Sequence, residues 1–332
     1  MKSIVMLSFG TEKEYKRAIF SILSFWSWFN EKKSGVRFII YTDNTEYFKP
    51  FLLGLDIIYK NISSKEIQES NAITGYKYRF KISVVEKTFA LYPDDDLIFI
   101  DTDTFFFTDP QQLLSALVPG QSLMHLREYT FEDAIDIYKW ENTSTLDGQQ
   151  FPRSFVQLIE SKSFLIGDKN IDFNRHQYIW NSGVLGLTKE MAAYIPNVYA
   201  LTDEFYAKTQ WRISEQLAFG LVLNSVSKLL ETGDYISHYW HYKDRIDLRL
   251  NELLTSDFEK LSLKNKLSAV RKKTLKFCKL IHHEQMMTNT KNYMREKDYK
   301  NGLKYAVKAF IGLPFNDDLI KIIKYRLSQV KS

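Results

Sequence analysis

An apolar run that ends on two aspartates constrains the fold of this chain more than any other segment. Four apolar residues, 97–100, precede Asp101, and Asp103 follows after one intervening residue. A run without polar alternation is typical of a strand buried on both faces, as in a parallel sheet. Helix and strand patterns alternate before it, which predicts βα units with right-handed crossovers. We therefore expect the α/β class, with a mixed, mainly parallel sheet flanked by helices.

The expected elements continue this alternation. The 332 residues suffice for one large α/β body, expected at residues 1–255, and a helical C-terminal segment at residues 256–332. Residues 128–175 are expected to be irregular and to face the substrate. We predict strands at residues 3–9, 36–41, 55–59, 97–100, 121–126, 178–187 and 228–231, body helices at 12–29, 76–91, 189–205 and 213–223, and C-terminal helices at 263–282, 298–310 and 317–327, the last two as a hairpin.

Composition and charge limit the compartment and the partners. Cys278 is the single cysteine, which excludes a disulfide framework and favours a reducing, cytoplasmic location. The first strand is too short for a signal-peptide core, and no apolar run reaches the roughly 18 residues that span a bilayer. Residues 260–332 carry 18 Lys and Arg against 5 Asp and Glu, whereas residues 1–259 carry 27 against 35. This asymmetry is not typical of a nucleic-acid reader; it predicts peripheral contact with an anionic membrane.

The aspartate pair lies where open α/β sheets bind ligands, beyond the carboxyl end of a strand. Two carboxylates there suit Mn²⁺ or Mg²⁺, which can hold a diphosphate. A solvated turn would explain an Asp-x-Asp pair equally well, but three phenylalanines at 105–107 follow this one. We therefore predict a metal at Asp101 and Asp103, with chemistry on a nucleotide-linked substrate.

The nucleotide itself has no glycine-rich loop to hold it. None of the 13 glycines forms a dinucleotide-binding or P-loop pattern. Strand ends and the metal must then supply the contacts. The candidates for nucleotide and donor binding are Ser8, Gly10 and Thr11 after the first strand, Thr42 and Asp43 after the second, and Thr102 between the aspartates.

Asn181, Ser182 and Gly183 form a second informative segment. Their bend can present an amide and a hydroxyl to sugar hydroxyls, and the glycine lets a ligand approach the backbone. A β-bulge with a capping asparagine explains the same residues. The choice between the two stays open.

Ser214, Glu215 and Gln216 open a predicted helix. Ser214 is the expected N-cap, and the other two lie in the first turn. There a carboxylate commonly complements the helix dipole, so a catalytic role is the less common explanation.

Basic and imidazole side chains complete the set of candidates. His238 or His241 can add a neutral ring nitrogen to the metal site, and Lys243 would neutralise a leaving diphosphate. A packed strand edge is the simpler reading of that aromatic segment. Arg79 and Lys81 are candidates for nucleotide phosphates, with a solvated basic face as the alternative.

In this order, the strand–Asp–Thr–Asp, Asn–Ser–Gly, Glu–Gln and His-x-x-His-x-Lys segments resemble the motifs of GT-A fold glycosyltransferases. Over residues 1–250 the chain looks closest to glycosyltransferase family eight and its relatives, which include glycogenin and bacterial lipooligosaccharide galactosyltransferases. The resemblance implies a Rossmann-like nucleotide-diphospho-sugar transferase fold, with Mn²⁺ chelated by Asp101, Asp103 and His238. It also implies that Asn181 and Ser182 lie near the donor sugar and that Lys243 contacts the β-phosphate.

Two departures from the family pattern leave the donor and the stereochemistry open. His241 stands where the family has glycine, and Lys243 comes one residue early. The family's Asp-Gln-Asp segment is replaced by residues 214–216, Ser-Glu-Gln.

The expected function is the metal-dependent transfer of a hexose from a nucleoside-diphosphate sugar, favoured as a UDP-sugar, to a saccharide or glycolipid acceptor in bacterial-type surface glycan synthesis. The catalytic candidates are Glu215, Gln216 and Asn181. In a retaining reaction Glu215 or Gln216 would stabilise the sugar cation; in an inverting one Glu215 would be the base. The alternatives are a haloacid-dehalogenase-type phosphatase using Asp101 and Asp103, which expects threonine where Phe105 stands, and a catalytically silent sugar-nucleotide-fold binding module.

Overall fold

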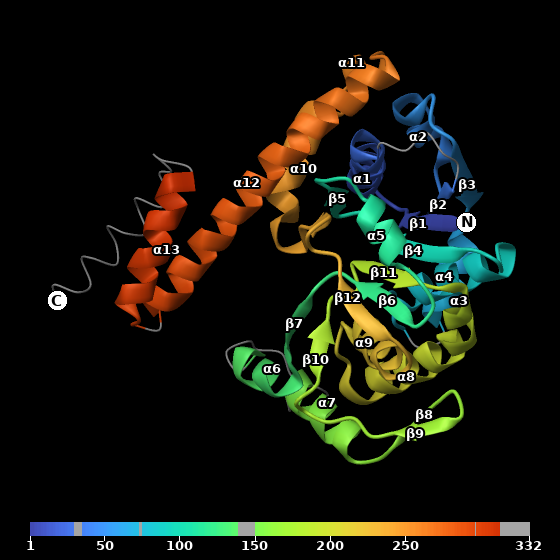
Figure 1. Ribbon diagram of the computed structural model, residues 1–332, viewed down its shortest axis with the longest axis vertical. Coiled ribbons are helices and arrows are strands. Elements are labelled where there is room, and N and C mark those ends of the chain that lie inside the picture. The colour runs from blue at the N-terminus through green and yellow to red at the C-terminus, as the bar shows by residue number, and fades with distance from the viewer. Residues whose placement is uncertain (30–34, 73–74, 139–149, 296, 313–332) are drawn as a thin grey trace.

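A mixed seven-stranded sheet organises the body of the molecule (Figure 1). The computed structural model describes residues 1–29, 35–72, 75–138, 150–295 and 297–312. Neighbouring strands of the sheet pair in parallel except at β11, which is antiparallel to both of its neighbours. In spatial order the strands are β12 (Lys228–Glu231), β6 (Gln121–Met124), β11 (Val184–Leu187), β4 (Asp96–Ile100), β1 (Lys2–Ser8), β2 (Val36–Thr42) and β3 (Ile57–Asn61).

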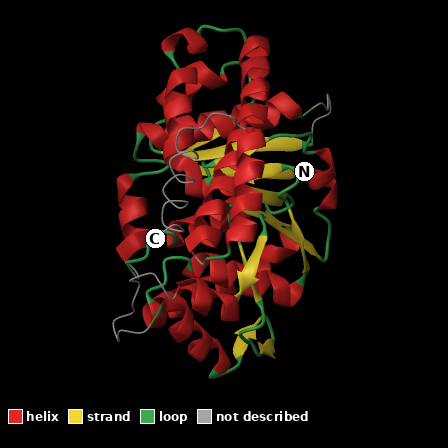
Figure 2. Cartoon of the chain, turned by 90° about the vertical axis from the view of Figure 1, so that its left-hand side faces the viewer, coloured by secondary structure: helices red, strands yellow, loops and turns green. Residues whose placement is uncertain are grey.

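The predicted α/β class with a mainly parallel, helix-flanked sheet is confirmed. Alternate residues of the central strands enter two separate cores: Val5 packs on one face of the sheet, and Ile4 and Met6 pack on the other. Helices cover both faces (Figure 2). They are α1 (Glu12–Trp28), α2 (Thr45–Leu52), α5 (Gln111–Ala116), α10 (Lys243–Leu253) and α11 (Ser256–Glu259) with the second core, and α3 (Ser64–Ala72), α4 (Arg79–Leu91), α8 (Ile195–Thr209) and α9 (Ser214–Val226) with the first.

The predicted strand at residues 178–187 is wrong as a single element. Its first part, β10 (Tyr178–Trp180), pairs with β7 (Arg127–Thr130) outside the main sheet, and only β11 enters that sheet. The break falls at residues 181–183, where the backbone N–H of Asn181 donates to the carbonyl of Leu126 and its C=O accepts from the N–H of His125. Three residues with catalytic or donor-binding assignments therefore lie in the connection rather than in a strand.

Three further expectations need correction. Within the described part of residues 128–175 the chain is ordered rather than irregular. The helix predicted at 189–205 starts as a 3₁₀ turn, η2 (Lys189–Tyr194), because Pro196 lacks an N–H and fits only a first helical turn. Ser214 is not an N-cap, since its hydroxyl donates to the carbonyl of Trp211. The elements in the described part of residues 128–175 are β7, α6 (Phe131–Ile137), α7 (Phe151–Glu160), β8 (Phe164–Ile166) and β9 (Lys169–Ile171).

The C-terminal segment begins with one long helix, α12 (Leu263–Arg295), which extends well beyond the predicted end at 282. Its first half packs on α1 of the body, where Phe277 lies 5.1 Å from Phe20 between ring centroids and the Trp28 indole donates to Thr274 at 3.1 Å. The second half packs against α13 (Tyr299–Gly312). The hairpin is thus formed by α12 and α13, and residues 317–327 lie outside the described residues.

Within the described part of the chain, no helix combines the length and the apolarity that crossing a bilayer requires.

Candidate metal and donor site

One short antiparallel strand pairing brings the predicted metal ligands together. Asp101 and Asp103 connect β4 to β5 (Thr104–Phe106), and β5 pairs antiparallel with β13 (Ile236–His238), which places His238 opposite Thr104. Ligand atoms of Asp101, Asp103 and His238 all lie within 4.8 Å of one another. His241 is not in this group; its ring stacks on Trp240 in η3 (Trp240–Tyr242). Of the two histidines that the sequence offered as metal ligands, His238 is therefore the one that lies beside the aspartates.

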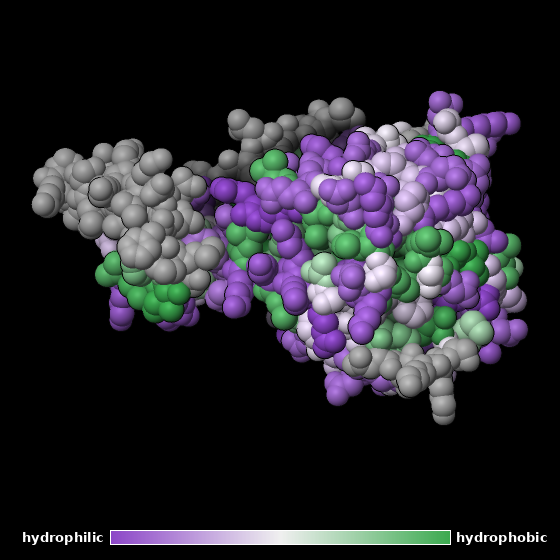
Figure 3. Space-filling view, turned by 90° about the horizontal axis from the view of Figure 1, so that it is seen from above, coloured by the Kyte–Doolittle hydropathy of each residue, from purple (hydrophilic) through white to green (hydrophobic). Residues whose placement is uncertain are grey.

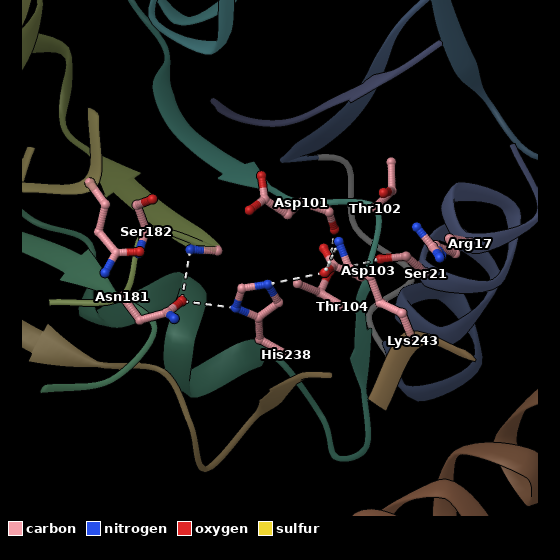
Figure 4. Close-up of polar contacts among 12 residues, drawn as sticks. Arg17, Ser21, Asp101, Thr102, Asp103, Thr104, Asn181, Ser182, His238 and Lys243 are labelled. Atoms are coloured by element: carbon pink, nitrogen blue, oxygen red, sulfur yellow. Dashed lines mark hydrogen bonds and ion pairs between the residues drawn. The ribbon is translucent and has the colours of Figure 1, made fainter. Parts of the chain in front are cut away.

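Asp103 is the most enclosed member of the group. Its side chain is 5% exposed, and Oδ2 lies 2.8 Å from Lys243 Nζ and 3.4 Å from His238 Nε2 (Figure 4). Burial opposes ionisation of this carboxyl, but the Lys243 ammonium beside it holds its pKa well below the usual range. Asp103 is therefore an anion at neutral pH, as a metal ligand must be.

Asp101 faces a second cation, Lys81 on α4. The Lys81 ammonium lies 3.3 Å from Asp101 and 3.2 Å from Glu215, and it donates to the backbone carbonyl of Ser182 at 2.6 Å. Burial opposes the charge on Lys81, yet the two carboxylates raise its pKa. Burial raises the pKa of Glu215, and Lys81 works against that rise. Lys81 and Glu215 thus form a buried charge pair beside the metal ligands.

The bend at residues 181–183 lies between this pair and His238. Ser182 donates from Oγ to Glu215 at 3.3 Å, and its backbone N–H approaches the Gln216 side chain at 3.5 Å. Asn181 contacts the ring of His238 at 2.8 Å. Asn181, Ser182 and Glu215 are buried, whereas Gln216 and His238 are half-buried.

The residues predicted to hold the nucleoside gather at the carboxyl ends of β1 and β2. Asp43 accepts hydrogen bonds from the backbone N–H of Gly10 at 3.0 Å and from the hydroxyl of Tyr15 at 2.8 Å. Thr11 caps α1, and the Thr42 hydroxyl accepts from the backbone of Asn44. The buried hydroxyl of Ser8 has no hydrogen-bond partner within the described residues.

Two predicted donor contacts are occupied elsewhere. Arg79 points away from Lys81 on the same helix and forms an ion pair with Asp203 on α8 at 2.8 Å. The Thr102 hydroxyl donates to Glu14 at 2.6 Å. Neither side chain contacts the metal ligands, because each bonds to a flanking helix.

The sequence did not reveal Glu128 and His125. Glu128 accepts from the Asn181 side chain at 3.0 Å, and burial raises its pKa. His125 packs edge-to-face on His238 with ring centroids 5.4 Å apart, and burial, with His238 beside it, lowers the pKa of His125 to about 3. His125 directly follows β6, and its place at the end of that strand was the one available signal; Glu128 lies within β7, which the sequence did not predict.

The donor set fits a divalent cation. Two carboxylates and an imidazole supply the oxygen and nitrogen ligands that Mn²⁺ and Mg²⁺ accept, with Mn²⁺ the more tolerant of nitrogen. Their ligand atoms converge within 4.8 Å, so no rearrangement of the backbone is needed for all three to reach one ion.

No protein-family profile matches the chain, and no curated protein sequence matches it. Solved structures match parts of the chain at low sequence identity. Mouse xyloside xylosyltransferase 1 in its apo form matches with a TM-score of 0.41 and 14% identity over 70% of this chain and 85% of that one. The apo structure of the WbbM bifunctional glycosyltransferase matches with a TM-score of 0.45 and 11% sequence identity; the match covers 74% of this chain and 44% of that one. The galactosyltransferase LgtC, in complex with donor and acceptor sugar analogues, matches with a TM-score of 0.44 and 11% sequence identity; the match covers 76% of this chain and 96% of that one.

Proposed function

We propose that this protein is a metal-dependent glycosyltransferase whose donor is a nucleoside-diphosphate sugar, favoured as a UDP-sugar. The convergence of Asp101, Asp103 and His238 at the carboxyl edge of a parallel sheet is the observation that supports this function most directly. A divalent cation bound there, Mn²⁺ or Mg²⁺, supplies Lewis-acid stabilisation of the diphosphate leaving group.

The chain's own residues have separate roles in this proposal. Lys243 has a side chain 39% exposed and brings positive charge to the place where the leaving diphosphate gains negative charge. The ends of β1 and β2, with the unpartnered Ser8 hydroxyl, face the nucleoside. Thr42 and Asp43 hold that edge in place.

The contacts of Glu215 favour a retaining reaction. Its two carboxylate oxygens face Lys81 and Ser182, so Glu215 is not free to take a proton from an acceptor hydroxyl. Gln216 is half-buried beside it and is the more accessible of the two to a sugar. We assign Gln216 to stabilising the sugar cation, with the leaving phosphate accepting the acceptor's proton.

The inverting alternative makes a different prediction. If Glu215 were the base, Glu215→Gln would lower turnover by two or more orders of magnitude and the product would have the opposite anomeric configuration. Proton NMR of the product measures that configuration directly. In the retaining reaction the configuration of the donor is preserved.

A panel of UDP- and GDP-sugars, assayed for hydrolysis with Mn²⁺ and with EDTA, tests the function. We expect turnover of at least one donor that EDTA abolishes. Hydrolysis of a phosphate monoester instead of sugar nucleotides would indicate the phosphatase alternative. Binding of a donor without turnover would indicate a silent binding module. Unchanged turnover in EDTA would contradict the metal role.

The acceptor in this proposal is a saccharide or glycolipid at the inner face of a membrane, with the enzyme in the cytoplasm. Helix α13 supports it, because Tyr299, Leu303, Val307 and Ile311 form an exposed stripe at i, i+4 spacing. A lysine follows three of these residues, at 300, 304 and 308. Figure 3 shows hydrophobic and hydrophilic side chains side by side at this end of the molecule. Such a face fits an anionic lipid surface.

A further inference from the structure

The ring of His238 is held from three sides. Nδ1 lies 2.8 Å from Asn181 Oδ1, and Nε2 lies 3.4 Å from Asp103 Oδ2 (Figure 4). His125 packs edge-to-face against the ring. The His238 side chain is only 8% exposed. Its orientation is therefore set by protein groups before any ligand binds.

The amide of Asn181 can point only one way. Its Oδ1 accepts the backbone N–H of Gly183 at 3.0 Å, and its Nδ2 donates to Glu128 Oε1 at 3.0 Å. A flipped amide would set NH₂ against the N–H and oxygen against the carboxylate, so both bonds would become repulsive. The atom that faces His238 is therefore an oxygen, which accepts and cannot donate.

An acceptor opposite Nδ1 fixes the tautomer of the ring. Nδ1 must carry the hydrogen, and in the neutral ring Nε2 then has its lone pair directed toward the Asp103 carboxylate. Two lone pairs that face each other are favourable only when a cation is shared between them. The arrangement thus prepares Nε2 to be a ligand.

Gly183 supplies the space for this arrangement. A Cβ atom at position 183 would lie 2.2 Å from His238 Nδ1, which is far inside contact distance. The glycine expected to admit a ligand to the backbone instead admits the His238 ring. The same short bend therefore provides the acceptor and the room for the imidazole.

We propose that Asn181 and Gly183 are positioning residues for His238: they fix its Nδ1–H tautomer so that Nε2 binds a divalent cation, and Glu128 holds the Asn181 amide in the required orientation. This inference rests on the metal site of the proposed function. Residues that hydrogen-bond to a metal ligand in this way usually contribute 10- to 100-fold to metal affinity. Asn181, expected from the sequence to lie near the donor sugar, acts in this proposal on the metal ligand His238 instead.

The first test is ¹⁵N NMR of the imidazoles in the metal-free, full-length protein at pH 8. The chain has six histidines, and His238→Gln identifies the signal by its loss. We expect a protonated Nδ1 and a bare Nε2 at His238. In Asn181→Leu the ring should revert to the Nε2–H form that predominates in free imidazole side chains. His125→Phe, which keeps an aromatic contact but no polar atom, should retain Nδ1–H.

The second test is Mn²⁺ affinity, measured by electron paramagnetic resonance without any sugar nucleotide. Asn181→Leu should raise the Kd for Mn²⁺ about 10- to 100-fold, while His125→Phe should change it less than threefold. Asn181→Asp combined with Glu128→Gln reverses the polarity of one hydrogen bond and keeps an acceptor at Nδ1. This double variant should restore Nδ1–H and most of the affinity.

The double variant also covers the case in which Asn181→Leu does not fold. A His238 ring that carries its hydrogen on Nε2 in the parent protein would overturn the inference. So would parental Mn²⁺ affinity in Asn181→Leu, or a double variant that folds but loses both the tautomer and the affinity. Because neither readout uses a donor sugar, absence of transferase activity would count against the proposed function alone.

Discussion

Asp103 is the residue on which the proposed chemistry depends most directly, since it contacts both His238 and Lys243. Asp103→Asn keeps the shape of the side chain and removes its charge. We expect Mn²⁺-dependent turnover to fall at least about 100-fold, because the charged ligand is lost. Lys243 is partly exposed and can turn to solvent, so the melting temperature should shift little. Steady-state assays with a melting curve check both results.

The matched control for this variant is Asp94→Asn, an exposed aspartate in the turn before β4. It should keep both parental activity and parental Mn²⁺ affinity. An Asp103→Asn protein with parental turnover would remove Asp103 from the metal site.

The buried thiol of Cys278 predicts how stability and thiol reactivity change with pH. Burial raises the pKa of its thiol to about 11, from an ordinary value of 9.0. The folded state therefore favours the neutral thiol, and the stability that this provides is present below pH 9 and is lost as the pH rises toward 11. Alkylation by iodoacetamide should be slow at pH 8 and rise steeply only above pH 10, because the thiolate is the nucleophile.

Mass spectrometry of the single cysteine measures this rate without ambiguity. The same reaction in guanidinium chloride should follow the lower, ordinary pKa. A native protein that reacts at pH 8 as fast as the unfolded chain would show that Cys278 is not protected.

At the scale of elements, an ion pair joins α1 to α10 next to the site. Arg17 donates to both carboxylate oxygens of Asp247 at 2.7 and 2.5 Å, and both residues are 6% exposed. Asp247→Ala removes this partner while Glu14 still pairs with the guanidinium, so we expect it to lower the free energy of unfolding by about 1.5–3 kcal/mol. Chemical denaturation measures the loss.

Asp244→Ala, on the exposed face of the same helix, should change stability by less than about 0.5 kcal/mol. The double variant Arg17→Met with Asp247→Leu removes both charges and should recover most of the stability. If Asp247→Ala were as stable as the parent, the pair would not join the two helices energetically.

At the scale of the whole molecule, the proposed membrane contact depends on α13, which lies at the end of the α12–α13 hairpin away from the sheet (Figure 1). Each basic residue near an anionic surface contributes about 1 kcal/mol, and salt screens that contribution. The protein should therefore sediment with anionic vesicles at low salt and be released as ionic strength rises. Neutral vesicles should retain little.

Leu303→Asp places a charge within the exposed stripe and should weaken vesicle binding several-fold. Leu248→Asp is the matched control, because Leu248 is similarly exposed but lies on α10 of the body. Equal recovery with anionic and neutral vesicles would contradict the proposal and leave α13 as a structural cap on α12.

The sequence alone determined the α/β class and the position of the two aspartates that we propose as metal ligands. A buried strand is a local pattern, and the carboxyl end of such a strand is a known position in a parallel sheet, so Asp101 and Asp103 could be placed without tertiary contacts. The helical nature of the C-terminal segment was likewise readable from spacing, although the end of its first helix was not.

The tertiary structure alone decided which other side chains lie beside Asp101 and Asp103. His238 rather than His241 reaches the aspartates because β13 pairs with β5, and Lys81 rather than Arg79 faces the site because α4 packs with one face on the sheet. Glu128 reaches Asn181 only through the pairing of β7 with β10. Each of these contacts joins segments far apart in the chain, and local residue patterns do not encode such pairings.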